Sequence, residues 1–470
     1  MELDPILLSR IQFAFVVSFH AIFPVFTIGL ASYLALLYGL FVKTGNPAWE
    51  RLAEFWTRVF AVVFGMGVVS GIVMSFQFGT NWSNFSQATA NFLGPMLSYE
   101  VLTAFFLEAG FLGVLLFGRN RVSPGVHLFA AIMVAIGTFI SAFWILATNS
   151  WMHTPDGVEL RNGVFHVTSW LDAIFNPSFP YRFTHMALAS FLAGGFVVAG
   201  VSAWYLLRGH DVEANRKALS MTLWLLLIAA PTQAVVGDFH GVNTLEYQPA
   251  KIAAIEAIWE TESSVPLLLF AIPDQEDQTN HAEIGIPMLG SLILTHDPNG
   301  KLMGLEEIPR DEQPPVVFTF YGFRIMVGLG ILMIAFALAG LILRRGGRIY
   351  TNRVFLQGLR LMSVAPFIAV LAGWITTETG RAPWLVYGMM THAEGVTPSL
   401  SGAMALFTLI GYVAVYAVVF YSGVYYLTRV IRKGMLDDSD EAHEVERPSR
   451  PMSAAHVPFD DDDDSAPARS

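Results

Sequence analysis

Eight ionisable side chains lie inside stretches of this sequence that are otherwise almost entirely apolar. A charged group in such a stretch is costly to bury, so each one is by default a candidate for function. They suit metal ligation by imidazole or carboxylate, proton transfer by paired carboxylates, and anion binding by guanidinium. The eight are His20, Glu100, Glu108, His127, His185, Arg324, Arg360 and Glu378.

Histidine and methionine are the candidate iron ligands. The chain has no cysteine, which excludes disulfides, iron–sulfur clusters and covalently attached haem, so a metal must be held by His, Met or carboxylate. His20 is either hydrogen-bonded between helices or an iron ligand, and His185 is either interfacial or a ligand. Met326 would usually only pack, but paired with His185 it would give a six-coordinate, electron-transferring haem. His127 is interpreted as structural.

Two carboxylates in one apolar segment suggest proton transfer. Glu100 and Glu108 are eight residues apart, about two helical turns or 12 Å, which places both near one face of a helix. The alternative is a pair of protonated carboxyls that hydrogen-bond between helices.

The segment around Glu378 and the residue Arg324 have two interpretations each. Glu378, Trp374 and Arg381 lie close together in the sequence, which suits an interfacial anchor and also a site for an anionic cofactor. Arg324 is either a snorkelling anchor or the partner of a haem propionate.

Composition shows what must position these residues. Of 470 residues, 54% are hydrophobic and only 14% charged, with a mean hydropathy of +0.51, whereas a soluble domain carries about 25% charged residues. A soluble enzyme is therefore excluded, and we expect an all-α, polytopic membrane protein without a removable signal peptide. Nine apolar stretches are long enough to span a bilayer: 11–42, 59–78, 94–118, 122–150, 183–207, 218–236, 316–343, 354–377 and 403–428.

Basic residues predict the orientation. Arginine and lysine concentrate after odd-numbered stretches, for example Lys43, Arg119, Arg208, Arg344 and Arg429, which places the N-terminus outside and the C-terminus in the cytoplasm. His20, Glu100, His185, Arg324, Met326 and Glu378 then all fall in the outer half. Glu108 lies nearer the cytoplasm than Glu100, so protons would reach Glu108 first and then Glu100, through water or a hydroxyl such as that of Ser141.

The regions outside the stretches divide into a loop and a tail. The outer loop at about 237–315 is too polar to cross a membrane and long enough to be functional, and the spacing of its apolar residues at 250–259 predicts a surface amphipathic helix. Residues 436–470 carry eleven acidic residues against three arginines, and thus most of the net charge of −11. Their composition predicts a disordered, acidic cytoplasmic tail behind a membrane domain of residues 1–435.

At these residues the sequence resembles the large subunit of cytochrome bd-type quinol oxidases over about residues 1–435. The outer loop resembles the short form, and 94–100 and 237–241 resemble the cyanide-insensitive branch. The motifs that carry the likeness are Gly79–Ser83, Glu100–Glu108, Lys251–Glu256, Pro273–Gln275, Phe323–Met326 and Gly380–Trp384.

The resemblance implies a set of site residues and cofactors. His185 and Met326 would ligate a low-spin haem b, while His20 and Glu378 would serve two high-spin haems where O2 is reduced: one haem b, and one haem d or a third haem b, without copper. Glu100, Arg324, Trp374 and Arg381 would form the haem environment. In the outer loop, Glu256 would accept protons from quinol and Lys251 would position it.

The implied function is a terminal quinol oxidase of the bacterial cytoplasmic (inner) membrane. It would oxidise ubiquinol or menaquinol outside and reduce O2 to water with cytoplasmic protons, building a potential without a pump. Its partners would be the bilayer and a second membrane subunit, with a small accessory subunit left open and no nucleic acid. The alternatives are a haem–copper oxidase, which needs about six intramembrane histidines, and an ion-coupled transporter, whose inverted repeats are not apparent.

Overall fold

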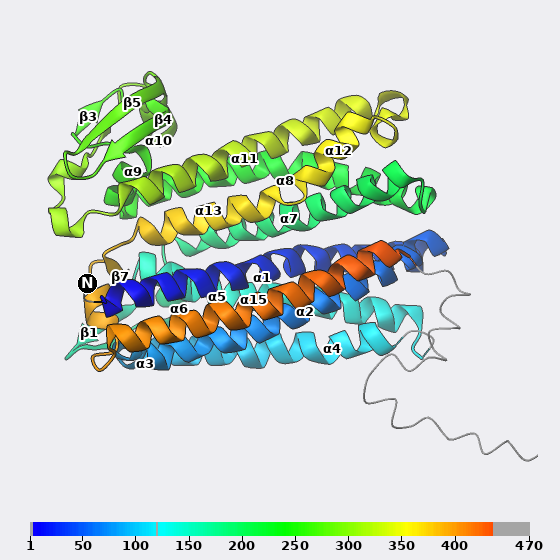
Figure 1. Ribbon diagram of the computed structural model, residues 1–470, viewed down its shortest axis with the longest axis horizontal. Helices are drawn as coiled ribbons and strands as arrows, with labels where there is room; N and C mark the ends of the chain where they lie inside the picture. The colour runs from blue at the N-terminus through cyan, green and yellow to red at the C-terminus, as the bar shows by residue number, and fades with distance from the viewer. Residues whose placement is uncertain (1–2, 119–120, 436–470) are drawn as a thin grey trace, which may run out of the picture.

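The computed structural model describes residues 3–118 and 121–435. Within them, nine helical segments are long and apolar enough to cross a membrane, and Figure 1 shows them running side by side along the long axis. They are α1 (Pro5–Thr44), α2 (Pro47–Thr80), α3 (Ser83–Glu100) continued by η1 (Val101–Phe105) and α4 (Phe106–Phe117), α5 (Pro124–His153), α7 (Phe179–Arg208), α8 (Val212–Tyr247), α11 (Val316–Leu343), α12 (Arg353–Met362) with α13 (Ala365–Thr379), and α15 (Gly402–Lys433).

Local sequence signals start several of these helices. Asp4 caps α1, with its carboxylate accepting from the Ile6 backbone amide, and Asn46 and Ser123 cap α2 and α5 in the same way. Proline follows each of these three caps, at the position where its missing N–H costs nothing. Apolar composition makes the segments membrane-spanning, and the caps determine where they begin.

The helix α1 lies at the centre of the bundle. It packs against α2, α5, α7, α13 and α15, and its side chains Leu30, Leu34 and Leu37 are completely or almost completely buried. A second core joins α7 and α8 to α11 and α12 through residues such as Phe196 and Leu359. Because each helix is held on several sides, the side chains that face the interior have fixed positions.

Short elements cluster at one end of the bundle. Residues 248–315, which we call the lobe, form α9 (Pro249–Glu256), β3 (Glu262–Ser263), β4 (Leu267–Asp274), β5 (Thr279–Ile286), α10 (Leu289–Thr295), β6 (Lys301–Leu302) and two 3-10 turns, η2 (Leu305–Glu307) and η3 (Arg310–Glu312). The lobe and the start of α1 lie at the same end, the lobe end, and α15 finishes at the other, the tail end (Figure 1).

The remaining short elements connect helices. The segment between α5 and α7 holds β1 (Val158–Arg161), β2 (Val164–Val167) and α6 (Trp170–Ile174), and that between α13 and α15 holds β7 (Trp384–Val386), β8 (Met390–Thr391) and α14 (His392–Gly395). A 3-10 turn, η4 (Arg345–Tyr350), joins α11 to α12. The strands pair only as two-stranded antiparallel ribbons, β1–β2, β3–β6, β4–β5 and β7–β8, so among the described residues the fold is helical.

The structure confirms the predicted helical membrane fold with some corrections. Most helices exceed the predicted apolar stretches, and α8 continues to Tyr247, so the loop begins at Gln248 rather than at about 237. The predicted surface helix at 250–259 is wrong in one respect: α9 exists, but Ala250 to Glu256 are all buried, because the rest of the lobe covers them. The tail at 436–470 and Arg119 lie outside the described residues.

Candidate functional site

His20, on α1, has one ring nitrogen engaged and one available. Its Nδ1 lies 2.9 Å from Ser70 Oγ of α2, and that hydroxyl donates to the carbonyl of Gly67 at 3.0 Å. The hydroxyl therefore accepts from the ring, so Nδ1 carries the proton and Nε2 keeps its lone pair. A Cβ at Gly71 would lie 3.0 Å from the ring. A ring fixed at one nitrogen with the other free is the usual arrangement of a metal-ligating histidine.

His185 and Met326 lie on α7 and α11, which both pack against α8 and α13. The Nδ1 of His185 is buried and has no hydrogen-bond partner in the part of the chain that the structure describes. Each side chain faces a glycine: a Cβ at Gly237 would lie 3.3 Å from the imidazole Cε1, and one at Gly373 would lie 2.7 Å from Met326 Sδ. Glycine thus lets both predicted ligands pack closely against a neighbouring helix, and the histidine Nδ1 has unused bonding capacity.

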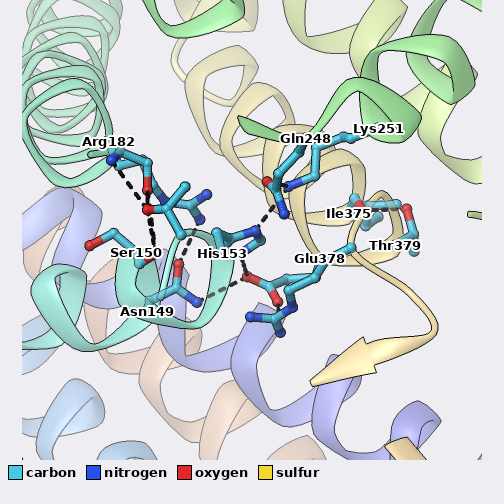
Figure 2. A network of polar contacts seen from close by, with 12 residues as sticks. Asn149, Ser150, His153, Arg182, Gln248, Lys251, Ile375, Glu378 and Thr379 are labelled. Atoms are coloured by element: carbon cyan, nitrogen blue, oxygen red, sulfur yellow. Dashed lines mark hydrogen bonds and ion pairs between the residues drawn. The ribbon is translucent and has the colours of Figure 1, made fainter. Parts of the chain in front are cut away.

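Glu378, at the end of α13, is surrounded by donors from other segments (Figure 2). Its Oε1 accepts from Asn149 Nδ2 at 3.0 Å and from His153 Nε2 at 3.3 Å, both on α5. Its Oε2 accepts from Arg381 at 2.5 Å, and Arg182 of α7 donates to Asn149 at 2.6 Å. The contacts hold the carboxylate as an anion between two buried arginines.

His153 joins this carboxylate to the lobe. Lys251 Nζ of α9 lies 2.9 Å from His153 Nδ1 and donates to Gln248 at 2.6 Å. The Glu378 carboxylate only accepts, so Nε2 carries the ring proton and donates to it, and Nδ1 of the neutral ring accepts from Lys251. Burial and the charge of Arg182 hold the pKa of Lys251 well below its usual range, and Glu378 opposes this. A continuous chain of hydrogen bonds therefore runs from the lobe to the membrane-embedded carboxylate (Figure 2).

Several buried donors near Glu378 have no acceptor among the described residues. They are Trp374 Nε1, Arg381 Nε and Nη1, and Arg182 Nε. A buried donor without an acceptor is rare and calls for a missing partner. Three donor side chains around one carboxylate suit an anionic group bound between α5, α7 and α13.

Glu256 and Arg324 form a second pair, between the lobe and α11. Arg324 Nη2 lies 2.8 Å from Glu256 Oε2, and the guanidinium also donates to the carbonyls of Ile255 and, at 2.9 Å, Leu268. Burial raises the pKa of Glu256, while Arg324 acts in the opposite direction. Lys251 and Glu256 thus have different partners, although they lie on the same short helix.

The two acids of α3 and α4 face α5. Ser141 Oγ donates to Glu100 Oε1 at 2.8 Å, and a Cβ at Gly137, one turn away from Ser141, would lie 2.6 Å from Glu108 Cγ. The π-helical turn η1 lies between the acids and shifts their helical register, yet both face the same neighbour. Glu108 Oε1 is buried, and no residue within 3–118 or 121–435 forms a hydrogen bond with it.

Sequence reasoning missed the polar residues that link these sites. Asn149, His153, Arg182 and Gln248 all belong to the Glu378–Lys251 chain (Figure 2). A signal existed for two of them, because Asn149 and His153 are one helical turn apart at the end of an apolar stretch. His127 behaves as expected, with Nε2 3.0 Å from the Leu115 carbonyl.

Together, the helical bundle and its buried imidazole, thioether and carboxylate groups are those of a membrane protein whose interior side chains suit metal ligation. The model of cytochrome bd terminal oxidase subunit I matches residues 8–435, and the chain belongs to that family. It is 34% identical to cytochrome bd ubiquinol oxidase subunit 1 of Bacillus subtilis, over 96% of this chain and 98% of that one. Its identity to cytochrome bd-II ubiquinol oxidase subunit 1 of Escherichia coli is 30%, over 92% and 97%.

A solved structure agrees with the sequence relatives. The bd oxidase of Geobacillus thermodenitrificans has a chain that superposes with a TM-score of 0.86 at 33% identity, covering 92% of this chain and 99% of that one. The protein is therefore a haem-binding, multi-pass membrane subunit of a quinol:oxygen oxidoreductase. This finding replaces the haem–copper oxidase and transporter alternatives.

The residues present fit haem. Among the described residues, His185 Nδ1 has no hydrogen-bond partner, and the contact with Ser70 leaves His20 Nε2 unprotonated. Met326 Sδ lies against Gly373. The buried donors of Trp374 and Arg381 that lack an acceptor match the carboxylates of haem propionates. Imidazole, thioether and carboxylate are all established haem or iron ligands in proteins.

Proposed function

We propose that His185 and Met326 hold a low-spin haem b, and that His20 and Glu378 hold two high-spin haems, one haem b and one haem d or third haem b. Bound haem supplies one-electron transfer and a place for O2 to bind. The chain's own contribution is to fix the ligands: Ser70 orients the His20 ring, and Arg381, His153 and Asn149 keep Glu378 ionised and in place.

Quinol oxidation is assigned to the lobe-end pair Lys251 and Glu256. Oxidising a quinol releases two protons, which requires a base. The raised pKa of Glu256 brings this buried carboxyl closer to neutral pH, where it is a better acceptor than an ordinary carboxylate. Arg324 holds its orientation, and Lys251, tied through His153 to Glu378, lies where hydrogen-bonding to the quinol oxygen would connect it to the haem region.

Proton delivery for O2 reduction is assigned to Glu108, Ser141 and Glu100, in that order from the tail end. The unpartnered oxygen of Glu108 leaves capacity for a water molecule, and the Ser141–Glu100 hydrogen bond supplies the next step. A hydroxyl that donates to one carboxylate can accept from a water behind it, so a proton can move along the row.

The lobe end is assigned to the outer side of the bacterial cytoplasmic membrane. The basic residues Arg208, Arg344, Arg429 and Arg432 lie at the opposite ends of their helices, which follows the positive-inside rule. Quinol protons would then leave outside, while protons for water formation come from the cytoplasm, building a potential without a pump. The quinol is ubiquinol or menaquinol, and the assembly includes a second membrane subunit.

The chain of hydrogen bonds Lys251–His153–Glu378 is the observation that carries this assignment, because it connects Lys251 of the proposed quinol pair to a proposed haem ligand. The test is a haem assay of the purified complex, combined with reduced-minus-oxidised spectra. We expect three haems for each copy of this chain, one of them low-spin and reduced by quinol. A complex with fewer haems, or with a low-spin haem that quinol does not reduce, would contradict the assignment.

A further inference from the structure

The β4–β5 hairpin of the lobe exposes a row of large apolar side chains. Leu269, Phe270, Ile272, Ile284 and Ile286, which we call the hairpin patch, are between 43% and 61% exposed. Contiguous apolar surface of this kind marks an interaction site in a folded protein.

The patch is a second apolar face, separate from the one that holds the hairpin on the protein. Leu268 and Ala271 of β4 are buried in the lobe core. Phe270 and Ile284 are direct cross-strand partners, so their side chains share the outward face. The register irregularity between Leu268 and Phe270 leaves Leu269 exposed beside Phe270, and Ile272, two residues further along the strand, lies on the same face as Phe270. The hairpin thus buries one apolar face and leaves another uncovered.

Hydrogen bonds hold β4 beside the first turns of α11 and not beyond the end of that helix. Tyr321 Oη donates to the Ala271 carbonyl at 2.8 Å, and Arg324 Nε donates to the Leu268 carbonyl at 2.9 Å. These two side chains are five and eight residues beyond the start of α11 at Val316, which is about 8 and 12 Å along the helix axis. The strand therefore overlaps the first turns of a membrane-spanning helix (Figure 1).

The length of α11 gives the depth of that overlap. Its 28 residues measure about 42 Å, whereas the hydrocarbon core is about 30 Å thick, or about 20 residues. Arg344 and Arg345 follow the helix directly and suit the tail-end interface. Counting about 20 residues back from Leu343 reaches Arg324, so Arg324 lies at the hydrocarbon boundary and Tyr321 at headgroup level. An average tilt of about 20° moves this boundary by only about one residue.

The patch continues the exposed apolar surface of α11. Val317, Phe318 and Ile325 are exposed on the same turns of that helix, and the Phe270 ring lies 6.5 Å from the Tyr321 ring. The tip of the hairpin is different: Glu276 and Asp277 are exposed acids. An apolar face at headgroup depth with an acidic tip suits a structure that lies in the bilayer interface and keeps its turn in water.

We propose that the hairpin patch is a membrane-contact surface, seated in the interfacial layer of the lobe-side leaflet against phospholipid. The same guanidinium that binds Leu268 also binds Glu256. The lipid-seated strand and the proposed quinol base are therefore fixed to one side chain at one depth. The membrane contact is inferred from the fold alone. Only the link between this contact and the quinol base rests on the proposed function.

This chain has no cysteine, so single cysteines can be introduced into it and labelled in the full complex, reconstituted in phosphatidylcholine nanodiscs, with the label taken up by the parental complex subtracted. Phe270→Cys and Ile284→Cys carry an environment-sensitive fluorophore. Ile331→Cys, on the exposed face of α11, is the lipid control, and Asp277→Cys is the water control. Only labelled complexes with the parental haem spectrum are compared.

We expect nitroxide-labelled lipid to quench the Phe270 and Ile284 probes at least about threefold more than the Asp277 probe, and aqueous iodide to do the reverse, as for an element seated about 5–10 Å into the interface. Iodide quenching equal to that of the Asp277 probe would overturn the proposal, since the patch would then face water. Protection from both quenchers would also overturn it, because a protein surface would then cover the patch. Loss of activity in Glu256 variants bears on the quinol assignment alone and leaves this result unchanged.

Discussion

Glu378 at the lobe end and the acid pair Glu100–Glu108 all place carboxyl groups inside the helical bundle, but they differ in how many hydrogen-bond donors surround them. Glu378 has three protein donors and two buried arginines near it, whereas Glu100 has a single hydroxyl and Glu108 an oxygen with no partner. Dense pairing fixes an anion in one geometry, as a ligand requires. Sparse pairing leaves room for water and for a proton to arrive and leave, as a conduit requires.

Glu378→Gln is the change with the largest expected effect. It removes the negative charge between Arg182 and Arg381, and an uncompensated buried charge costs about 3–5 kcal/mol. We expect loss of a high-spin haem and a less stable complex, measured as the haem-to-protein ratio and the thermal unfolding midpoint. Glu394→Gln is the control, because that acid is an exposed capping-box residue at the same end. A full haem complement in Glu378→Gln would rule out the ligand role.

The low-spin haem is tested by removing its two proposed ligands separately. His185→Ala and Met326→Leu should abolish or convert the low-spin b signal and stop haem reduction by quinol, while the protein still inserts. Met333→Leu is the matched control, since Met333 is buried on the same helix but is not assigned a ligand role. An unchanged low-spin spectrum in both variants would contradict the assignment.

Glu256→Gln separates quinol chemistry from O2 chemistry. We expect quinol oxidation to fall strongly because the proton acceptor is gone, while O2 consumption driven by an artificial donor to the haems continues. Burial raises the pKa of Glu256 above its ordinary value of 4.5, and only the deprotonated form accepts a proton. Activity of the parental enzyme should therefore decline as pH falls through this raised pKa.

In Glu256→Gln, the residual quinol oxidation should not show this decline in activity at low pH. Glu262→Gln is the control, because Glu262 belongs to the same lobe and is exposed. If quinol-driven and donor-driven activities fall together in Glu256→Gln, the lobe acts through folding or haem assembly, and its assignment as the quinol site is wrong.

The membrane-spanning helices could be predicted from the sequence more completely than the hydrogen bonds between their polar side chains. The stretch at 316–343 matches α11 residue for residue, because hydropathy alone defines a membrane span. The Glu378–Lys251 chain was not predictable, since His153 contacts partners 98 and 225 residues away and resembles any polar residue at a helix end. The burial of α9 was also missed, because a short helix with a lysine and a glutamate has the pattern of a surface helix until the lobe covers it.

Glu108→Gln tests the start of the proposed proton path, where the carboxylates have few hydrogen-bond partners. Turnover should slow while all haems are retained, because Glu108 contacts no proposed haem ligand in the described chain and its proposed role is proton transfer alone. Steady-state O2 consumption and the haem-to-protein ratio of the same preparation measure both effects. Glu100→Gln is the comparison: it lies nearer the proposed O2 site and should also disturb a haem spectrum. Full turnover with normal charge translocation in Glu108→Gln would refute the order of transfer.

Ser141→Ala should have the smallest effect. It removes one donor to Glu100, and a hydrogen bond to a charged group contributes about 1.5–3 kcal/mol, which water in the widened site would partly replace. We therefore expect a loss of turnover of less than about tenfold, together with a larger solvent deuterium isotope effect as proton transfer becomes more rate-limiting. Ser98→Ala is the matched control, because the Ser98 hydroxyl donates to the carbonyl of Gly94 in its own helix. A loss as large as that of Glu378→Gln would mean that Glu100 is held as rigidly as a ligand, and the contrast between the two carboxylate sites would fail.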